Sequence, residues 1–447
     1  MSYWISQSVD GAPLTKAVRA EGVYVYGEDG KRYIDSTGGP GLFSLGHGHP
    51  EVTAAIKDQF DQLAYGFSMT FTTDVVEELS ETIVTAAGAD HFGGVFYSSS
   101  GSEANEHALK AARQYHLARG EPERTHFIGR KLSWHGATLG VLDVGHHLWR
   151  RSLYESELGR ATHVSAPMLY RPPEGVAPED LAQHYADELD AEIRRVGPAR
   201  VAAFIFEPIG GGTGGILPPP AGYAQAMRAV CDDHGVLMIA DEIFCGVGRT
   251  GKWRALEHEG VQPDIMTIAK GLSGGYMPLS ACVLSRQVRE AIDGAYGNLE
   301  AARTYSGHTA ACAAGRAVLG IIERDGLVEK VAADGIYLKE RLDRALGQDD
   351  AVGDIRGCGL MWGVELVRDR DTKEPFDPAL QVWKRYRDAA LENGMLSYQG
   401  GAIIDGERGD YALVTPAYTA TREELDEIVD KVALSIRQAV ESARDAA

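Results

Sequence analysis

From about residue 50 onward, stretches with helical periodicity alternate with short apolar segments of strand length. The expected helices cover 51–63, 74–87, 102–118 and 223–234, and the expected strands cover 94–97, 200–206, 236–243, 264–268 and 280–284. Alternation of this kind is typical of strands that run in the same direction and are joined by crossover helices. The pattern therefore predicts an α/β fold with a large, mostly parallel sheet and helices on both faces.

The two ends of the chain have a different texture. Residues 22–35 alternate apolar and polar around a D-G turn, which predicts a β-hairpin. Beyond about residue 310 we expect a smaller α+β domain, with helices at 309–324, 328–346 and 422–446 and a strand at 360–367. The expected division is an N-terminal segment 1–49 that contributes to the small domain, a large domain 50–310, and a C-terminal small domain 311–447.

Composition excludes several classes of protein. The 64 acidic against 44 basic side chains give a net charge of −20, which argues against nucleic acid as a partner. No apolar run reaches the roughly 18 residues of a membrane helix, and residues 1–11 lack the basic start and apolar core of a signal peptide. The five cysteines are widely spaced and form no C-x-x-C pair, as in proteins of a reducing compartment. We therefore expect a cytoplasmic protein without a membrane partner or a metal site.

Two predicted strands end at residues that could take part in catalysis. The strand 236–243 delivers Asp241 near its C-terminal end, where ligands bind in open α/β sheets. A buried carboxylate there needs a cation, which could be a protonated pyridine nitrogen, a metal ion or an arginine such as Arg249. Lys270 follows the strand 264–268 and precedes a glycine-rich turn. An amine among apolar neighbours can lose its proton and attack an aldehyde, whereas a lone loop lysine is usually solvated.

Two glycine-containing segments are candidates for a phosphate-binding site. The sequence GVGRTG at 246–251 matches G-x-G-x-x-G, but Trp253 replaces the hydroxyl that a phosphate loop needs and no clear helix follows. A structural loop is the better interpretation. The segment 98–118 is a strand end, a turn of small residues and a helix beginning near Ser102, which is suited to bind phosphate. A plain helix cap by Ser102 is the alternative.

These motifs together resemble the class III aminotransferases, which are pyridoxal-5′-phosphate (PLP) enzymes of fold type I, the aspartate aminotransferase-like fold. The resemblance extends over nearly the whole chain. Its most specific part is the lysine segment with the acid pair ahead of it at the family spacing. The motifs are SGSEAN (100–105), WHG (134–136), ADEIFCGVGRTGKW (240–253) and PDIMTIAKGLSGGYMPLSA (263–281).

The resemblance implies roles for the residues of the cofactor site. Lys270 would bind PLP as a Schiff base and shuttle the substrate proton, and Asp241 would keep the pyridine nitrogen protonated. The other implied contacts are stacking on the ring by Trp134 and Ile243, and phosphate binding by Gly101, Ser102 and, from a second subunit, Thr304.

Further residues have less specific roles. Glu207 would be an acid beside the cofactor or part of a structural salt bridge, and His135 would position its neighbours. For the substrate, Phe43, Trp134 and Arg408 are the candidates. Ornithine- and GABA-type members of the family carry a glutamate a few residues after the E-P pair, where this chain has glycines at 210–212. Amine:pyruvate-type members often have a mobile arginine, whose position falls near Gly406 here; Arg408 is close but out of register.

We thus expect a transaminase that moves an amino group from an amine or ω-amino donor to a keto acid, pyruvate before 2-oxoglutarate, by a ping-pong mechanism. The expected assembly is a homodimer, or a tetramer. Two alternatives stay open: a PLP isomerase such as an aminomutase, and a non-catalytic scaffold that keeps the fold.

Overall fold

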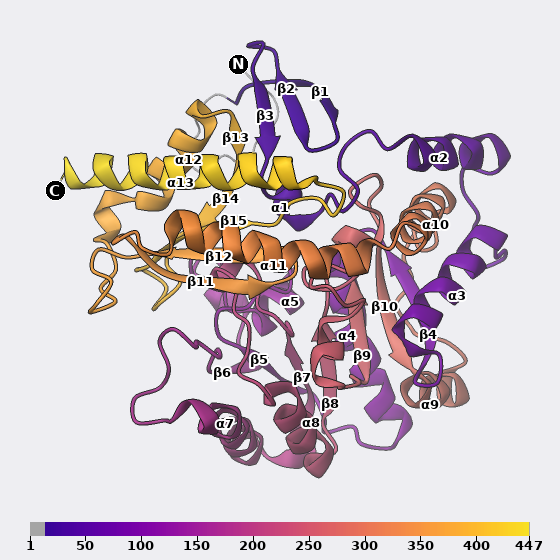
Figure 1. Cartoon of the computed structure of the whole chain (residues 1–447). Helices are drawn as coiled ribbons and strands as arrows, with labels where there is room; N and C mark the ends of the chain where they lie inside the picture. The colour runs from indigo at the N-terminus through magenta and orange to yellow at the C-terminus, as the bar shows by residue number, and fades with distance from the viewer. Residues whose placement is uncertain (1–13, 447) are drawn as a thin grey trace.

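The structure is a computed structural model that describes residues 14–446 (Figure 1). The expectation about a signal peptide at residues 1–11 lies outside this range. None of the helices within residues 14–446 has the length and apolar character needed to cross a membrane.

A seven-stranded sheet forms the centre of the larger part of the molecule. Only β10 runs antiparallel to its neighbours, and the other six strands are parallel, which confirms the predicted sheet. The strands, in spatial order, are β4 (Phe92–Ser98), β10 (Ser280–Ser285), β9 (Ile265–Ile268), β8 (Leu237–Asp241), β7 (Val201–Phe206), β5 (His126–Arg130) and β6 (Ala161–Val164).

Helices cover both faces of this sheet, and the strands explain why. In β7 all six residues are buried; Phe204 and Phe206 pack on one face, whereas Ala203 and Ile205 pack on the other. Alternate side chains of a strand point to opposite faces, so a continuous apolar run is what a doubly covered strand requires. One face packs against α7 (Leu181–Val196) and α8 (Tyr223–His234), and the other against α4 (Gly101–Ala118), α5 (Leu139–Val144) and α9 (Arg286–Tyr296).

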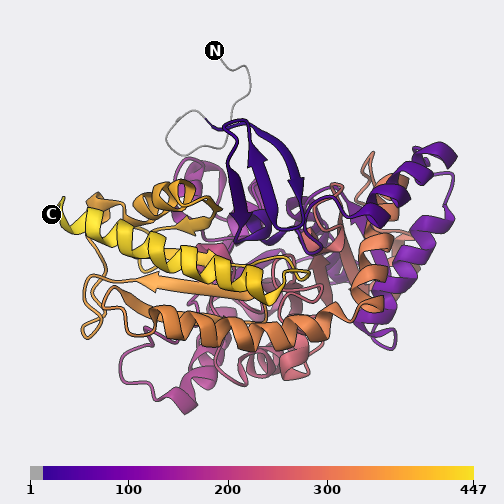
Figure 2. The same ribbon diagram turned by 45° about the horizontal axis from the view of Figure 1, so that its top comes forward.

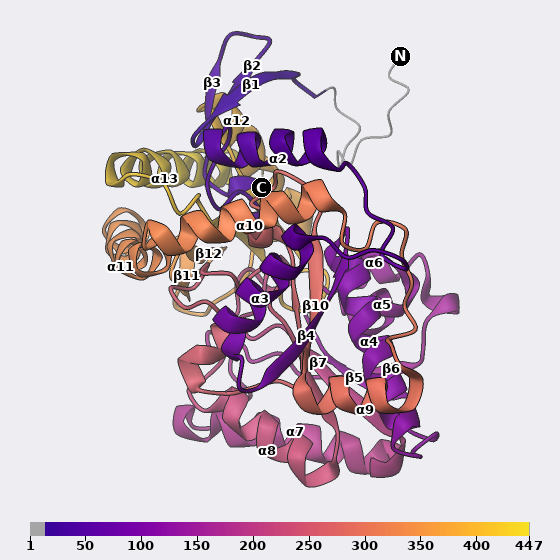
Figure 3. The same ribbon diagram turned by 90° about the vertical axis from the view of Figure 1, so that its right-hand side faces the viewer.

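The C-terminal part forms a second α+β layer. Its sheet has the order β11-β12-β15-β14, all antiparallel. The strands are β11 (Val352–Cys358), β12 (Met361–Leu366), β14 (Tyr398–Gly400) and β15 (Asp410–Val414), and the helices are α11 (Leu327–Leu346), α12 (Val382–Glu392) and α13 (Arg422–Arg444). Helix α10 (Thr309–Arg324) leads into this part and packs along α2 (Pro50–Gln62) and α3 (Asp74–Gly88) (Figure 3).

The predicted hairpin is present near the N-terminus as β2 (Tyr24–Gly27) and β3 (Arg32–Asp35), flanked by β1 (Ala17–Glu21). Strand β3 pairs in parallel with β13 (Met395–Leu396), which belongs to the C-terminal part. Hydrogen bonds from Tyr24 and Arg32 to Glu427 attach the hairpin to α13, and the two lie close together in Figure 2. The N-terminal strands and the C-terminal part therefore pack as neighbours, while the division into three domains stays a prediction.

The sequence did not predict several elements, among them β1, β5, β6, β11, β13, β14, β15, α5, α7, α9, α12 and the short helices α1 (Gly38–Gly41) and α6 (Leu148–Arg151). The glycines at 246–251 form turns, and the next helical segment begins only at Ala255. The expectation of a structural loop there is confirmed.

Candidate active site

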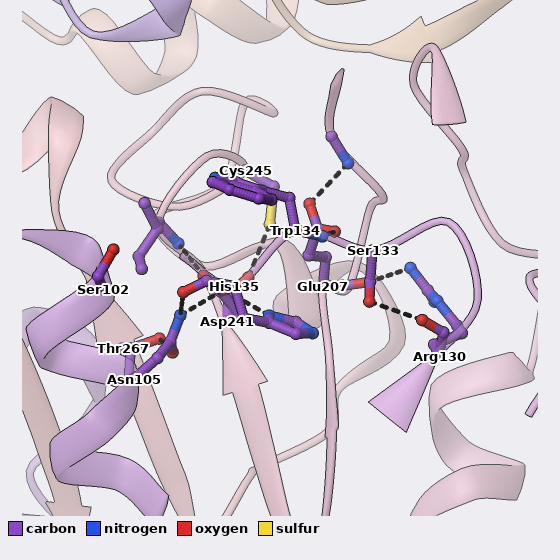
Figure 4. A network of polar contacts seen from close by, with 12 residues as sticks. Ser102, Asn105, Arg130, Ser133, Trp134, His135, Glu207, Asp241, Cys245 and Thr267 are labelled. Carbon is purple, nitrogen blue, oxygen red and sulfur yellow. Dashed lines mark hydrogen bonds and ion pairs between the residues drawn. The ribbon is translucent and has the colours of Figure 1, made fainter. Parts of the chain in front are cut away.

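The C-terminal ends of five parallel strands meet at one edge of the large sheet. This edge carries Asp241 at the end of β8, Glu207 directly after β7 and Lys270 two residues after β9. The loop after β5 brings Trp134 and His135, and the turn after β4 starts α4. The parallel arrangement therefore gathers residues that are far apart in the sequence into one site (Figure 4).

Three donors surround the buried carboxylate of Asp241. Its Oδ2 accepts hydrogen bonds from Asn105 Nδ2 and His135 Nδ1, both at 2.8 Å, and its Oδ1 accepts from the Ile243 backbone N–H at 3.0 Å (Figure 4). Asn105 is fixed in turn because its Oδ1 accepts from Thr267 Oγ1 at 2.8 Å. These hydrogen bonds fix the position of the carboxylate. His135 acts here by orienting Asp241.

The suggestion that Arg249 balances the charge of Asp241 is wrong. Its guanidinium donates to backbone carbonyls, and no ion pair joins it to any carboxylate within residues 14–446. Among the described residues 14–446, His135 is the basic side chain within ion-pair distance of Asp241, at 2.8 Å.

Glu207 holds the loop that carries Trp134. Its Oε1 accepts from the Trp134 backbone N–H at 3.0 Å, and its Oε2 accepts from the Gly211 N–H at 2.7 Å. Burial raises the pKa of this carboxyl, and His135 opposes the rise. Of its two expected roles, the salt bridge is not formed within residues 14–446; the acid instead fixes two loops beside the site.

Lys270 has the properties of a buried nucleophile. Its Nζ lies 4.0 Å from the centre of the Phe244 ring, and burial lowers its pKa from 10.5 to about 8, although Glu207 and Asp241 act to raise it. Its φ of +40° is in the left-handed region, which is rare for a residue with a Cβ and is often found at functional sites. A substantial fraction of this amine is therefore neutral near pH 8.

The start of α4 has the shape of a phosphate cradle. The helix begins at Gly101 and its cap is Ser100, whose Oγ accepts from Glu103 N–H; the expectation that Ser102 is the cap is wrong. Ser102 Oγ instead accepts from the Ala137 N–H at 3.1 Å. A Cβ at Gly101 would lie only 2.9 Å from Ile243 Cδ1, so a larger residue would fill the space beside the helix N-terminus.

These residues fit PLP in three respects. The N-terminus of an 18-residue helix, with its free N–H groups, suits the phosphate. The Asp241 carboxylate suits a protonated pyridine nitrogen, and the partly neutral amine of Lys270 suits the aldehyde. The donors and acceptors therefore match three different groups of one cofactor.

One residue beside the site was missed at the level of sequence. The guanidinium of Arg150 lies 4.9 Å from the Trp134 ring centre and 4.6 Å from that of Trp149, and no carboxylate in residues 14–446 lies within ion-pair distance of it. Burial raises the pKa of Tyr398, on which Arg150 and Glu207 act in opposite directions, so this tyrosine lies near both. No motif marks Arg150 in the sequence; it is simply part of the short helix LWRR.

The remaining candidates lie at different distances from this cluster. Phe43 packs on the turn after Lys270, because a Cβ at Gly275 would be 2.8 Å from its ring. The exposed Thr304 makes a backbone contact with the Tyr65 hydroxyl and has no hydrogen bond to the cluster within its own chain. Arg408 is exposed and pairs with Asp405 at 2.7 Å on its own loop, so its charge is already balanced.

Comparisons with known proteins agree with this geometry. The family model for class III aminotransferases matches residues 5–436. The chain is 42% identical over 441 residues to an uncharacterized aminotransferase of Schizosaccharomyces pombe, covering 98% of this chain and 96% of that protein. It is 36% identical over 438 residues to a diaminobutyrate–2-oxoglutarate transaminase of Halomonas elongata, covering 96% and 92%.

Among solved structures, the chain is similar to an amine transaminase from an uncultivated Pseudomonas species in its PLP-bound form. The TM-score is 0.92 at 34% identity, covering 98% of this chain and 99% of that one. Fold, site and relatives thus agree, and the chain belongs to the class III aminotransferases, PLP-dependent transaminases of fold type I.

Proposed function

We propose that this transaminase moves the amino group of an amine or ω-amino donor to a small keto acid by a ping-pong mechanism, in which the donor product leaves before the acceptor binds. The observation that carries the proposal is the presence, at one edge of the sheet, of the buried amine of Lys270, whose pKa burial lowers to about 8, and the buried carboxylate of Asp241, which Asn105 and His135 hold in place. PLP, when bound, accepts the amino group and withdraws electrons from the substrate carbon.

The protein's own groups have separate tasks in this proposal. Lys270 holds the cofactor through Nζ, and the same atom moves the proton to and from the substrate Cα. Asp241 would hold a proton at the pyridine nitrogen, and the hydrogen bonds from Asn105 and His135 orient its carboxylate. Trp134, fixed through its backbone by Glu207, covers the ring and excludes water.

We assign the acceptor carboxylate to Arg150 instead of Arg408. The guanidinium of Arg150 lies over the rings of Trp134 and Trp149 and forms no ion pair within residues 14–446, whereas Arg408 is paired with Asp405. The two other arginines near the cluster, Arg130 and Arg249, are buried and donate to backbone carbonyls. Arg150 is one guanidinium beside Trp134 without a carboxylate partner within residues 14–446, which suits an acid with one carboxylate and supports pyruvate over 2-oxoglutarate.

We also propose a homodimer as the working unit. Exposed aromatic and aliphatic side chains cluster in one short segment, an unusual surface for a monomer and one that a second copy would cover. They are Phe60, Leu63, Tyr65, Phe67, Met69 and Phe71. Thr304, whose carbonyl accepts from Tyr65, lies at the same surface and would reach the phosphate of the partner's cofactor. The five free cysteines support a reducing, cytoplasmic setting.

A subunit-mixing experiment tests the shared site. If Thr304 serves the partner, a mixed dimer of Lys270→Ala and Thr304→Ala subunits contains one site with both residues intact. Activity of the mixture then exceeds that of either parent and approaches half of wild type per dimer formed. If Thr304 serves its own subunit, mixing restores nothing.

The reaction itself is tested by a screen of amine donors against pyruvate and 2-oxoglutarate, read by the absorbance change between the aldehyde and amine forms of the cofactor. We expect keto or aldehyde product and alanine in equal amounts, and none with Lys270→Ala. Rearranged amine without net transfer to an acceptor would instead indicate an isomerase.

A further inference from the structure

The loop GVGRTG at 246–251 contains a buried arginine that the proposed reaction does not use. Arg249 is 1% exposed. Its Nη1 donates to Pro416 O at 2.5 Å and to Leu360 O at 3.1 Å, its Nη2 donates to Gly41 O at 3.5 Å, and its guanidinium lies 4.6 Å from the ring centre of Tyr418. The side chain therefore contacts three segments that are distant in sequence.

These segments are joined to the turn that carries Lys270. Gly41 belongs to the N-terminal segment, and Leu360 and Pro416 belong to the antiparallel C-terminal sheet region. The turn of Lys270 touches the same assembly, because a Cβ at Gly271 would lie 3.4 Å from Val247 and 3.5 Å from the Tyr418 hydroxyl. Arg249 thus bonds the N-terminal segment and the C-terminal part to the loop on which the lysine turn rests.

Further hydrogen bonds make this assembly continuous. Tyr418 donates from its hydroxyl to Val247 O at 3.0 Å and from its N–H to Ser44 O at 2.8 Å. Thr415 Oγ1 donates to Thr37 O at 2.9 Å. The strand-end segment 415–418 is therefore joined both to residues 36–44 and to the arginine loop.

Within residues 14–446, no carboxylate forms an ion pair with the guanidinium of Arg249. Burial lowers the pKa of its guanidinium; Tyr418 and Asp35 are the groups that oppose this, and Asp35 already accepts from the Thr37 and Gly39 backbone N–H groups. Of the charged and titratable groups that act on the pKa of Lys270, Glu207, Asp241 and Cys245 raise it and Arg249 lowers it. Arg249 is the cation among them.

We propose that Arg249 is a positioning residue for Lys270: it locks the N-terminal segment and the C-terminal part onto the lysine turn, and it places a fixed positive charge that disfavours a second one on the lysine nitrogen. The inference rests on the proposed role of Lys270 as the PLP-carrying residue. The two parts of the proposal, clamp and charge, are separable by substitution.

The test uses the PLP-loaded enzyme without substrate, and follows the pH dependence of the cofactor's absorbance together with the thermal midpoint. Arg249→Gln keeps a donor for the carbonyls but removes the charge, so the pH midpoint should rise by about one unit. Arg249→Lys keeps the charge but cannot bond three carbonyls, so it should lower Tm while the pH midpoint stays within about 0.3 units of wild type.

Arg151→Gln is the matched control. Arg151 is also buried and donates to three carbonyls, but those of Leu142, Asp143 and Gly145 all belong to the neighbouring stretch of chain and not to the segments around the lysine turn. It should lower Tm without moving the pH midpoint.

A pH midpoint for Arg249→Gln within about 0.2 units of wild type overturns the charge role. If Arg249→Gln fails to fold, Arg249→Lys provides the test. A shift of its pH midpoint by a full unit, although the positive charge is retained, would also contradict the charge role. An unchanged Tm in Arg249→Lys overturns the clamp. Failure of the proposed function would look different, because borohydride would then not fix PLP on Lys270 of the wild-type enzyme.

Discussion

Loading of PLP onto the apoenzyme should depend on pH as a reaction of an amine with a pKa of about 8. Burial removes water from the Lys270 ammonium, which lowers the pKa from 10.5 to about 8. At pH 7 about 9% of such an amine is neutral, against about 0.03% at the ordinary pKa, a ratio of about 300. Since only the neutral amine attacks an aldehyde, the site gains this factor near neutral pH.

The assay mixes apoenzyme and PLP by stopped flow between pH 6 and 11 and follows the absorbance of the covalent adduct. N-α-acetyl-lysine under the same conditions corrects for the titration of PLP itself, and Lys270→Ala shows which signal belongs to this residue. The enzyme rate should rise with pH up to about 8 and then level, so that its ratio to the model amine falls more than about 100-fold between pH 7 and 10.5. A constant ratio across this range would refute the argument from burial.

Three further predictions concern other parts of the site. Arg150→Ala should raise KM for pyruvate by about 10- to 150-fold, the equivalent of a charged hydrogen bond of roughly 1.5–3 kcal/mol, with little effect on the half-reaction of an amine without a carboxylate. As the control, Arg408→Ala should change KM for pyruvate less than twofold. The reverse result would assign the carboxylate to Arg408. Asp241→Asn should lower kcat by about a thousandfold or more. The neighbouring Glu242 is a buried acid that accepts from backbone N–H groups, so Glu242→Gln should lower Tm and leave kcat within about tenfold of wild type. Equal effects of the two substitutions on kcat would contradict the separate roles. Gly101→Ala should weaken PLP binding, measured by equilibrium dialysis, because the new Cβ would lie 2.9 Å from an isoleucine side chain; unaltered affinity would count against the cradle.

The parallel sheet and the two central residues could be predicted because each depends on a local pattern. A wholly apolar run such as β7 indicates a strand covered on both faces, and a polar residue at the end of such a run must lie at the ligand-binding edge. Asp241 and Lys270 follow from this rule without any knowledge of their contacts. The helix α10 was predicted with its observed limits, since its small and apolar residues face two neighbouring helices.

The missed elements have weaker local patterns. Strands β5 and β6 contain histidines, glycine or threonine, and β6 is a half-buried edge strand with only one neighbour, so neither forms a clear apolar run. The cap of α4 was misplaced among several serines, although the spacing S-x-x-E from Ser100 to Glu103 contained the signal. Such errors arise where several local choices are compatible with the same sequence.

The position of the carboxylate-binding charge is a different kind of problem, because it depends on which arginine remains unpaired after folding. Asp405 lies three residues before Arg408, and the two side chains form an ion pair at 2.7 Å. Arg150 has aromatic neighbours instead, and a ring face attracts a cation without neutralising it. The nearby Asp405 is therefore evidence against Arg408 that the sequence alone contains, whereas the contact of Arg150 with Trp134 can be seen only in the folded structure. Selecting a binding charge thus needs two steps, first the removal of cations that a nearby acid satisfies, and then a structure that brings one of the rest to the site.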